Sequence, residues 1–358
     1  MTLPLHLAGL YDSMRQDRAA DGQPANLYTL SNTAGMTATF MDIGATWISC
    51  TLPVADEQRE VVLGCRTLAD YQKQSAYMGA TVGRYANRLE KGQFTVDGTK
   101  YQVAVNQAGN TLHGGPDGFH QRRWTVQKND ASQVVFSLVS EHGDQGFPGQ
   151  LTASVTFTLT EDNALVIAYE AECDQACPVN LTNHAYFNLA GAESGHECLS
   201  HTLTIAAEAF VPTDEVGIPT GEWTSVVGTG FDFQEAKTIR QDFLADDDQR
   251  LAGGYDHAFV LLPTVTDGHT MAMQAVSPDH DVTLSVMTTK PAVQLYTGNF
   301  LEGNPAREGI YHQFDGFCLE TEYLPDAPNH PEWPEQGILA VGERYQHNTT
   351  YQFSIAKR

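Results

Sequence analysis

The chain has 358 residues, of which 41% are hydrophobic, with 31 glycines and 16 prolines, a composition typical of a turn-rich globular protein with a large core. A formal net charge of −24 opposes binding to nucleic acid or to an anionic membrane surface. No segment approaches the roughly 20 apolar residues of a membrane-spanning helix. The first ten residues show neither a basic region nor a cleavage site, so we expect a cytoplasmic protein.

Short strand-like segments recur along the chain, separated by turn signals. Phe94 to Val96 and Lys100 to Val103 flank Asp97-Gly98, which predicts a hairpin with a type I′ turn. The other predicted strands are residues 124–127, 134–139, 151–159, 164–171, 203–206, 258–262, 271–275, 282–286, 292–296, 316–320 and 351–355. Helical patterns are few and short, at Leu68 to Met78 and at Glu235 to Phe243.

The spacing of these strands indicates the fold class. Many short strands separated by turns are typical of an antiparallel sandwich or barrel and not of alternating βα units. No linker-like segment, shift in composition or fixed repeat divides the chain. We therefore predict an all-β protein, a large single-domain antiparallel β-sandwich over residues 1–358 with few short helices.

The six cysteines are scattered, and only Cys173 and Cys177 are close in the sequence. No second cysteine pair or histidine cluster accompanies them to complete a zinc site. We expect reduced, mostly buried thiols and no structural metal.

The segment from Asn180 to Leu189 places His184 inside a strand-like run, between asparagine, tyrosine and apolar residues. A histidine gains or loses a proton near neutral pH, and neighbouring amide and phenol groups can fix its tautomer. Taken alone, His184 is better explained as a core histidine with local hydrogen bonds. Polar residues elsewhere in the chain change that interpretation.

Four more segments set a polar or ionisable side chain beside glycines or apolar strand residues. They are residues 83–89, 110–115, 253–259 and 316–322. Each has an ordinary explanation: Arg88 as a surface arginine, His113 as a turn residue, Asp256 as a cap. Glu320 is harder to dismiss, because it follows a buried-looking strand and a buried carboxylate needs a partner. Together these groups suit a sugar, whose hydroxyls both donate and accept hydrogen bonds.

With these motifs the chain resembles the aldose 1-epimerase (galactose mutarotase) family, and its end is most similar to bacterial members. The matching motifs are residues 83–89, 112–115, 180–191, 218–222, 255–259, 296–301 and 317–334. The resemblance implies a galactose mutarotase-like supersandwich that interconverts the α and β anomers of free hexoses such as galactose and glucose. It implies small-molecule aldose sugars as partners and neither metal nor organic cofactor, and we expect a monomer or homodimer.

The resemblance also implies roles for particular residues. Glu320 is the general base and His184 the general acid. Sugar hydroxyls are contacted by Asn87, Arg88, His113, Tyr186, Asp256 and Gln294, and His113 is also expected near the reacting ring. Proton chemistry supports the two main roles: opening a hemiacetal takes a proton from the C1 hydroxyl and gives one to the ring oxygen. Both oxygens are attached to C1, so a base and an acid must flank one small centre.

Some positions depart from the family pattern or compete for a role. Ala258 stands where asparagine is frequent, and His120 stands where aspartate is common. These departures bear on sugar preference and loop structure and not on the reaction. Glu322 should face the same side as Glu320 in a regular strand, which makes it the alternative general base.

Three other functions compete with this interpretation. A glycoside hydrolase would use two carboxylates, for which Asp256 and Glu320 are available, but the histidine motif argues against it. A carbohydrate-binding module would bind the sugar without catalysis. A hexose-6-phosphate epimerase is disfavoured by the negative net charge and by the lack of a basic cluster beside Arg88.

Overall fold

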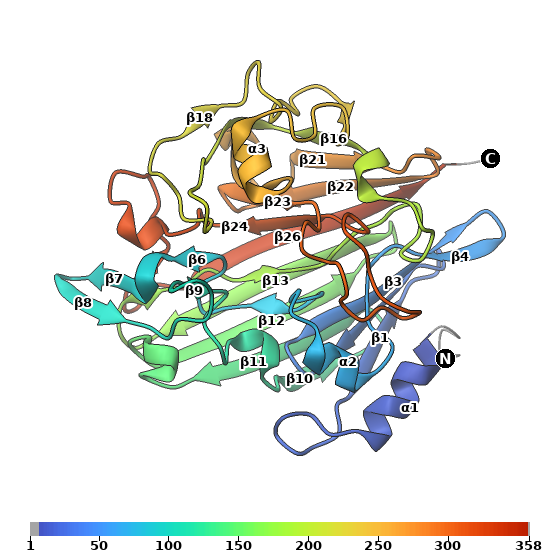
Figure 1. The fold of residues 1–358 in the computed structure, drawn as a ribbon. Helices are drawn as coiled ribbons and strands as arrows, with labels where there is room; N and C mark the ends of the chain where they lie inside the picture. Colours follow the sequence, from blue (N-terminus) through green and yellow to red (C-terminus); the bar gives the residue numbers. More distant parts are fainter. Residues whose placement is uncertain (1–6, 357–358) are drawn as a thin grey trace.

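A computed structural model describes residues 7–356, and its largest element is an antiparallel sheet of nine strands (Figure 1). In sheet order the strands are β10 (Thr125–Asn129), β11 (Gln133–Ser140), β12 (Leu151–Leu159), β13 (Ala164–Cys173), β26 (Tyr345–Ile355), β22 (Val282–Thr288), β21 (Met271–Val276), β16 (Thr202–Ile205) and β19 (Lys237–Thr238). Along β12 and β22 buried residues alternate with partly exposed ones, so one face of the sheet is packed and the other meets solvent.

Two further antiparallel sheets cover the packed face. In sheet order they are β1 (Leu27–Ser31), β2 (Thr37–Met41), β3 (Thr46–Val54) and β4 (Glu57–Glu60), and β18 (Thr224–Ser225), β17 (Ala207–Phe210), β20 (Asp256–Leu261), β23 (Ala292–Tyr296) and β24 (Cys318–Glu322). Aromatic rings join the layers: the Phe40 ring lies 4.2 Å from that of Phe157, and the Trp47 ring lies 5.7 Å from that of Tyr351. The predicted β-sandwich is confirmed.

β24 is buried along its whole length, because both of its faces are covered. Since side chains alternate along a strand, the odd-numbered residues Leu319 and Thr321 face one way and the even-numbered residues face the other. Leu319 belongs to the main core, and its backbone oxygen accepts a hydrogen bond of 3.0 Å from the Tyr351 hydroxyl on β26. One face of β24 thus packs on the nine-stranded sheet, and the other is free to build a site.

Four short strand pairs lie around the sandwich. They are β5 (Thr81–Val82) with β15 (Thr182–Asn183), β6 (Arg88–Leu89) with β9 (Thr111–Leu112), β7 (Gln93–Val96) with β8 (Thr99–Gln102), and β14 (Cys177–Pro178) with β25 (Ile338–Leu339). The β7–β8 pair is the predicted hairpin, and φ angles of 49° at Asp97 and 75° at Gly98 confirm its type I′ turn.

Most predicted strands are present, and the predicted bounds of β12 and β23 are those of the structure. The sheet of β1 to β4 was not predicted. Its central strand, β3, is buried at all of its positions but Pro53. A strand that is covered on both faces lacks the alternation that identifies a half-buried strand.

Helices are a minor part of the described residues. They are α1 (Ala8–Gln16), α2 (Leu68–Lys73) and α3 (Asp247–Ala252), with 3₁₀ turns η2 (Glu90–Gly92), η3 (Phe119–Gln121), η4 (Asp144–Gly146), η5 (Cys198–Ser200), η6 (Pro263–Val265) and η7 (Ala327–Asn329). α1 was not predicted. Of the first ten residues, in which the sequence shows no basic region or cleavage site, residues 1–6 lie outside the described part. Within that part, no helix has both the length and the apolar character needed to span a membrane. All six cysteines are free and buried, as expected.

Both predicted helices need correction. The first continues only to Lys73, because the side-chain Oε1 of Gln74 accepts the backbone N–H groups of Ala76 and Met78 and holds this stretch as a loop. The second, residues 235–243, is not helical: Lys237 and Thr238 form β19 and pair with β16. The Lys237 ammonium group donates to Gly230 O at 3.0 Å, so tertiary contacts override the local helical pattern.

Leu319→Ala should lower the free energy of unfolding by about 2–5 kcal/mol, because it leaves a cavity between β24 and the nine-stranded sheet. Leu319 is 1% exposed, whereas Val341 is 62% exposed and serves as the control. Val341→Ala should change stability by less than about 0.5 kcal/mol in the same urea titration. A loss below about 1 kcal/mol for Leu319→Ala would contradict the described packing of β24.

Candidate active site

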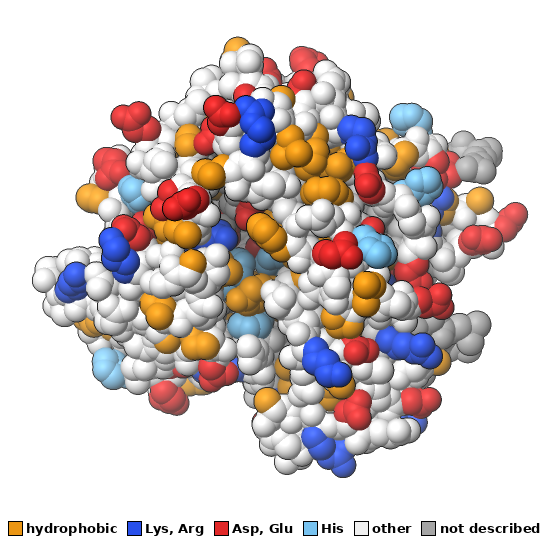
Figure 2. Space-filling model, viewed as in Figure 1, with side chains coloured by type: hydrophobic (Ala, Val, Ile, Leu, Met, Phe, Trp, Pro, Cys, Tyr) orange, Lys and Arg blue, Asp and Glu red, His pale blue; other side chains and the backbone are white. Residues whose placement is uncertain are grey.

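A cavity of about 220 Å³ lies over the even-numbered face of β24, and Figure 2 shows a hollow near the middle of this side with histidine side chains inside it. Its lining contains every residue that the sequence predicted for the site. These are Asn87, Arg88, His113, His184, Tyr186, Asp256, Gln294 and Glu320. The fold therefore brings six separate segments of the chain together, while the roles of these residues stay predictions.

The strand register of the five-stranded sheet positions three of these groups. Gln294 on β23 is the cross-strand neighbour of Glu320 on β24. On the other side of β23, Asp256 begins β20, and its Oδ1 accepts a hydrogen bond of 2.8 Å from Gln294 Nε2. Gln294 Oε1 is buried and has no hydrogen-bond partner among the described residues. A ligand hydroxyl can therefore donate to it.

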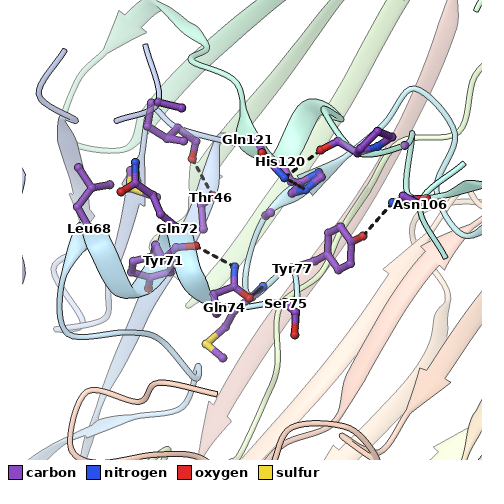
Figure 3. A pocket seen from close by; sticks show the side chains of 17 residues that line it. Thr46, Leu68, Tyr71, Gln72, Gln74, Ser75, Tyr77, Asn106, His120 and Gln121 are labelled. Atoms are coloured by element: carbon purple, nitrogen blue, oxygen red, sulfur yellow. Dashed lines mark hydrogen bonds between the residues drawn. The ribbon is translucent and has the colours of Figure 1, made fainter. Parts of the chain in front are cut away.

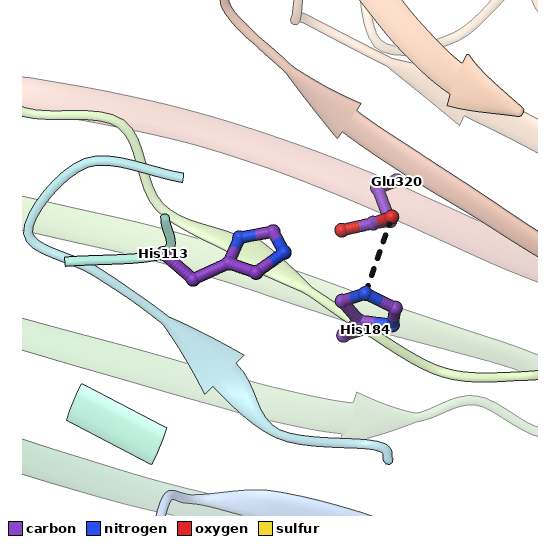
Figure 4. A group of neighbouring side chains, drawn as sticks. All are labelled: His113, His184 and Glu320. Carbon is purple, nitrogen blue, oxygen red and sulfur yellow. Dashed lines mark ion pairs between the residues drawn. The ribbon is translucent and has the colours of Figure 1, made fainter. Parts of the chain in front are cut away.

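His184 is held by its own backbone. Its N–H donates to Ala80 O and its carbonyl accepts from Gly79 N, both at 2.9 Å. The ring nitrogen Nε2 lies 3.5 Å from Glu320 Oε1 (Figure 4). The Tyr186 ring stacks on the imidazole at 5.0 Å, and its hydroxyl donates to Ala76 O at 2.9 Å. Tyr186 thus orients His184, and its own hydroxyl proton is already used.

His113 follows β9 and forms two hydrogen bonds with one residue. Its backbone N–H donates to Asn87 O, and the Asn87 backbone N–H donates to Nδ1 of the imidazole, both at 3.0 Å. The next residue, Gly114, has φ of 86°, and a Cβ there would lie 2.0 Å from Gly83 O. Only glycine lets these two segments approach so closely.

Asn87 links the loop to β24 and to Arg88. Its Nδ2 donates to Glu322 Oε1 at 2.9 Å, and its Oδ1 accepts the backbone N–H of Arg88 at 2.9 Å. The Arg88 guanidinium group contacts Gln107 Oε1 at 3.3 Å at the edge of the cavity. Of the two glutamates of β24, Glu320 lines the cavity, whereas Glu322 lies outside the lining and accepts a hydrogen bond from Asn87.

Burial changes the proton affinity of both glutamates. Removal from water raises the pKa of Glu320 well above its usual value, and the charge of Glu322 raises it further. Removal from water also raises the pKa of Glu322, opposed by the hydrogen bond from Asn87. The Oε2 atom of each has no hydrogen-bond partner among the described residues. When ionised, Glu320 is therefore a stronger base than an exposed glutamate.

Burial acts on the two histidines in the opposite direction. It lowers the pKa of His184 to about 4 and the pKa of His113 well below its usual value, so both rings are neutral at pH 7. Because Nδ1 of His113 accepts a hydrogen bond from the backbone N–H of Asn87, the proton of the neutral ring is on Nε2. His113 therefore presents a hydrogen-bond donor to the cavity.

His113, His184 and Glu320 offer three ligand atoms within 4.8 Å of one another, a spacing that could suit a metal ion (Figure 4). A histidine bound through Nε2 must carry its proton on Nδ1, where it normally donates to an acceptor. Nδ1 of His113 faces an N–H donor instead. The group therefore fits a ligand that accepts hydrogen bonds better than it fits a metal cation.

A larger cavity of about 420 Å³ adjoins the first and shares the wall formed by Ser75 and Tyr77 (Figure 3). Among the described residues that line it there is no Lys, Arg, Asp or Glu, and its amides bond largely to the protein, such as Gln121 Nε2 to Pro116 O at 3.1 Å. His120, one of the departures from the family pattern, lies here, with its ring 4.6 Å from that of Tyr77. The carboxylates, the arginine and two of the histidines line the smaller cavity, so we place the chemistry there.

Several residues of the smaller cavity were missed. Tyr77 lies in the loop that was predicted as helix, with φ of 52°. Tyr296 pairs with Asp256 across the sheet, and its hydroxyl accepts the backbone N–H of Phe300 at 2.8 Å. Phe300 is 70% exposed at the cavity. Tyr296 and Phe300 lie in the family-like motif 296–301, but no site role was predicted for them, and Tyr77 looks like an ordinary aromatic residue in the sequence. The fold shows that all three line one cavity.

Comparison with known proteins shows the family and the fold. The family model described as aldose 1-epimerase matches residues 26–352. The chain belongs to the aldose 1-epimerase family. It is 50% identical over 338 residues to the aldose 1-epimerase of Escherichia coli K12, covering 94% of this chain and 97% of that protein. It is 42% identical over 313 residues to human galactose mutarotase, covering 85% and 88%.

Solved structures of epimerases are similar as well. The GalM/aldose epimerase homologue from C. elegans superposes with a TM-score of 0.84 and 30% identity, over 93% of this chain and all of that one. Galactose 1-epimerase from Lactobacillus acidophilus gives 0.80 and 28%, over 93% and 99%. The predicted family and the predicted galactose mutarotase-like fold are confirmed.

Dialysis against a metal chelator should leave the Tm of the protein unchanged, because His113 cannot offer Nε2 to a metal while Asn87 donates to Nδ1. Elemental analysis of the purified protein should find far less than one metal ion per chain. A fall in Tm that added Zn²⁺ reverses would contradict this account of the three groups.

Proposed function

We propose that this member of the aldose 1-epimerase family interconverts the α and β anomers of a free aldose such as galactose or glucose, with Glu320 as general base and His184 as general acid. Family membership makes it an isomerase. The observation that carries the assignment of roles is the position of His184 Nε2, 3.5 Å from Glu320 Oε1, in the cavity lined by the predicted sugar contacts. A base and an acid this close can act on the two oxygens attached to one carbon.

The proposed reaction begins with Glu320 ionised and His184 neutral. Glu320 takes the proton from the C1 hydroxyl, and His184 gives its Nε2 proton to the ring oxygen as the bond between C1 and that oxygen breaks. The open aldehyde rotates about the C1–C2 bond and the ring closes on the other face of the carbonyl. The proton transfers leave Glu320 protonated and His184 as an imidazolate. On closure the imidazolate takes its proton back from the former ring oxygen and the carboxyl group returns its proton to the C1 oxygen, so both groups regain their starting states.

Binding is proposed to rest on the remaining lining residues. Arg88 and the Nε2–H of His113 donate to sugar oxygens, and Asp256 and Gln294 Oε1 accept from sugar hydroxyls. Asn87 accepts the backbone N–H of Arg88 and donates to Glu322, so it links the arginine to β24. Arg88 is the only Lys or Arg side chain in the described lining of the cavity. That single cation suits a neutral sugar better than a sugar phosphate.

The other candidate functions have less support. A hydrolase and a non-catalytic sugar-binding module are disfavoured by the names of the close relatives, which are aldose 1-epimerases and galactose mutarotases. Release of chromophore from an aryl glycoside would support the first. Binding of galactose without faster mutarotation would support the second. A cytoplasmic location and a monomeric or homodimeric state stay predictions.

Glu320→Gln and His184→Asn should each lower the mutarotation rate by about 100-fold or more, because each removes one proton transfer. Glu322→Gln should cost far less, since Asn87 occupies one of its oxygens and it lies outside the cavity lining. Polarimetry of freshly dissolved α-galactose measures all three. An equal loss for Glu322→Gln and Glu320→Gln would show that the base is wrongly assigned.

The pH dependence of kcat/KM should have an acid limb well above the pKa of an exposed glutamate. Glu320 acts as a base only when ionised, so activity falls as the pH decreases through its raised pKa. Glu322→Gln removes a nearby negative charge, which lowers the pKa of Glu320 and should move the limb to lower pH. Initial rates across pH, corrected for spontaneous mutarotation, provide the test, and a limb that moves to higher pH would contradict it.

Arg88→Ala and Asp256→Asn should raise KM by a larger factor than they lower kcat, because these groups bind the sugar in ground and transition states alike. Gln121→Ala, in the wall of the larger cavity, serves as the control and should leave both constants unchanged. If Gln121→Ala raises KM as much as Arg88→Ala does, the sugar site has been placed in the wrong cavity.

A further inference from the structure

His184 has a neighbour at its second ring nitrogen. Cys318 is the first residue of β24, two positions before Glu320 and on the same face, and it is fully buried. Its Sγ lies 3.5 Å from His184 Nδ1, while Nε2 of the same ring faces Glu320. The imidazole is thus held between two side chains of one strand.

We propose that Cys318 is a positioning residue that donates its S–H to Nδ1 of His184 and thereby fixes the imidazole proton on Nε2. This inference rests on the proposed function, in which Nε2 of neutral His184 delivers a proton to the ring oxygen. A neutral imidazole has one N–H, and the hydrogen bond at one nitrogen decides which nitrogen carries it. The wrong tautomer would present a lone pair where the acid must present a proton.

The surroundings of the thiol favour donation. Burial raises the pKa of Cys318 well above its usual value, and the charge of Glu320 raises it further, so the sulfur keeps its proton. The carbonyl of His184 accepts the N–H of Gly79, and its second lone pair can accept from a proton on Nδ1, which makes the Nδ1–H form the competing tautomer. No hydrogen-bond donor other than Cys318 contacts Nδ1 among the described residues.

The carboxylate on the other side of the ring favours the same tautomer. With the proton on Nε2, an N–H dipole points at Glu320 Oε1 across 3.5 Å. With the proton on Nδ1, a lone pair would face that negative oxygen, which is electrostatically unfavourable. Cys318 and Glu320, two residues apart on β24, therefore favour the same tautomer, with the proton on Nε2.

His113 shows the same arrangement with a different donor. Its Nδ1 accepts the backbone N–H of Asn87 at 3.0 Å, which leaves the proton on Nε2. Both histidines of the cavity then present Nε2–H to the sugar, one fixed by a backbone amide and the other by a thiol. A thiol is a weak donor, so the tautomer of His184 is the more sensitive of the two to substitution.

Nitrogen-15 NMR of the intact protein at neutral pH tests the tautomer directly, with His184→Asn used to assign the signals. The proposal expects a protonated Nε2 and an unprotonated Nδ1 in the wild-type ring, and a mixture of tautomers in Cys318→Ala. A proton on Nδ1 in the wild type, or an unchanged tautomer in Cys318→Ala, would overturn it. This readout is independent of whether the protein is an epimerase.

Kinetics provide the second test. Cys318→Ala should lower kcat by about 10–100-fold, as loss of a histidine-orienting partner commonly does, with little change in KM. Cys318→Ser keeps a donor of similar shape and should restore most of kcat and the wild-type tautomer. Cys198→Ala is the matched control, because Cys198 is also fully buried and, among the described residues, its sulfur has a hydrogen bond only to the backbone oxygen of Thr297, at 3.7 Å.

The outcomes distinguish a failure of the proposed role of Cys318 from a failure of the proposed function. Equal losses in Cys318→Ala and Cys198→Ala, or a Cys318→Ser variant as poor as Cys318→Ala, would show that the thiol has only a packing role. A wild-type protein without mutarotase activity but with His184 protonated on Nε2 would refute the proposed function and leave the tautomer assignment intact.

Discussion

The placement of β24 between the main core and the cavity is the constraint on which the site depends. Its odd-numbered residues pack on the nine-stranded sheet, where Tyr351 donates to the Leu319 carbonyl. Its even-numbered residues then have to face the cavity, which brings a thiol and two carboxylates to one side of a strand that is buried throughout. A slip of one residue would exchange the two sets and bury the carboxylates in the apolar core.

Burial of this face also sets the acid–base chemistry. Removal from water raises the pKa of Glu320, which makes its carboxylate a stronger base. It also lowers the pKa of His184 to about 4, which keeps the imidazole neutral, with a single N–H proton, at pH 7. The exclusion of water thus raises the pKa of the proposed base and lowers the pKa of the proposed acid, which stays a neutral imidazole.

Much of the fold and the site could be predicted from the sequence. Strands with one solvent face, such as β12, follow the alternation of apolar and polar residues. β3 was missed because it is covered on both faces and shows no alternation. The loop after Lys73 was mistaken for helix because a single side chain, Gln74, decides its conformation through two backbone contacts that a periodic pattern does not reveal.

Some of the cavity residues could also be predicted from the sequence, and others could not. Its histidines, carboxylates and arginine were found because polar groups beside glycines and apolar strands marked the motifs, and the resemblance of these motifs to the aldose 1-epimerase family implied the site residues. Tyr77 and Phe300 were missed, since an aromatic residue in a loop is usually a packing residue. The relation between Cys318 and His184 joins positions 134 residues apart, and only the fold brings them together.

A crystal structure of the protein soaked with galactose would test the central claim most directly. The account predicts that a Glu320 carboxylate oxygen lies within hydrogen-bond distance of the C1 hydroxyl and that His184 Nε2 lies within the same distance of the ring oxygen. A sugar bound with either group out of reach of its oxygen, or bound in the larger cavity behind Tyr77, would contradict it.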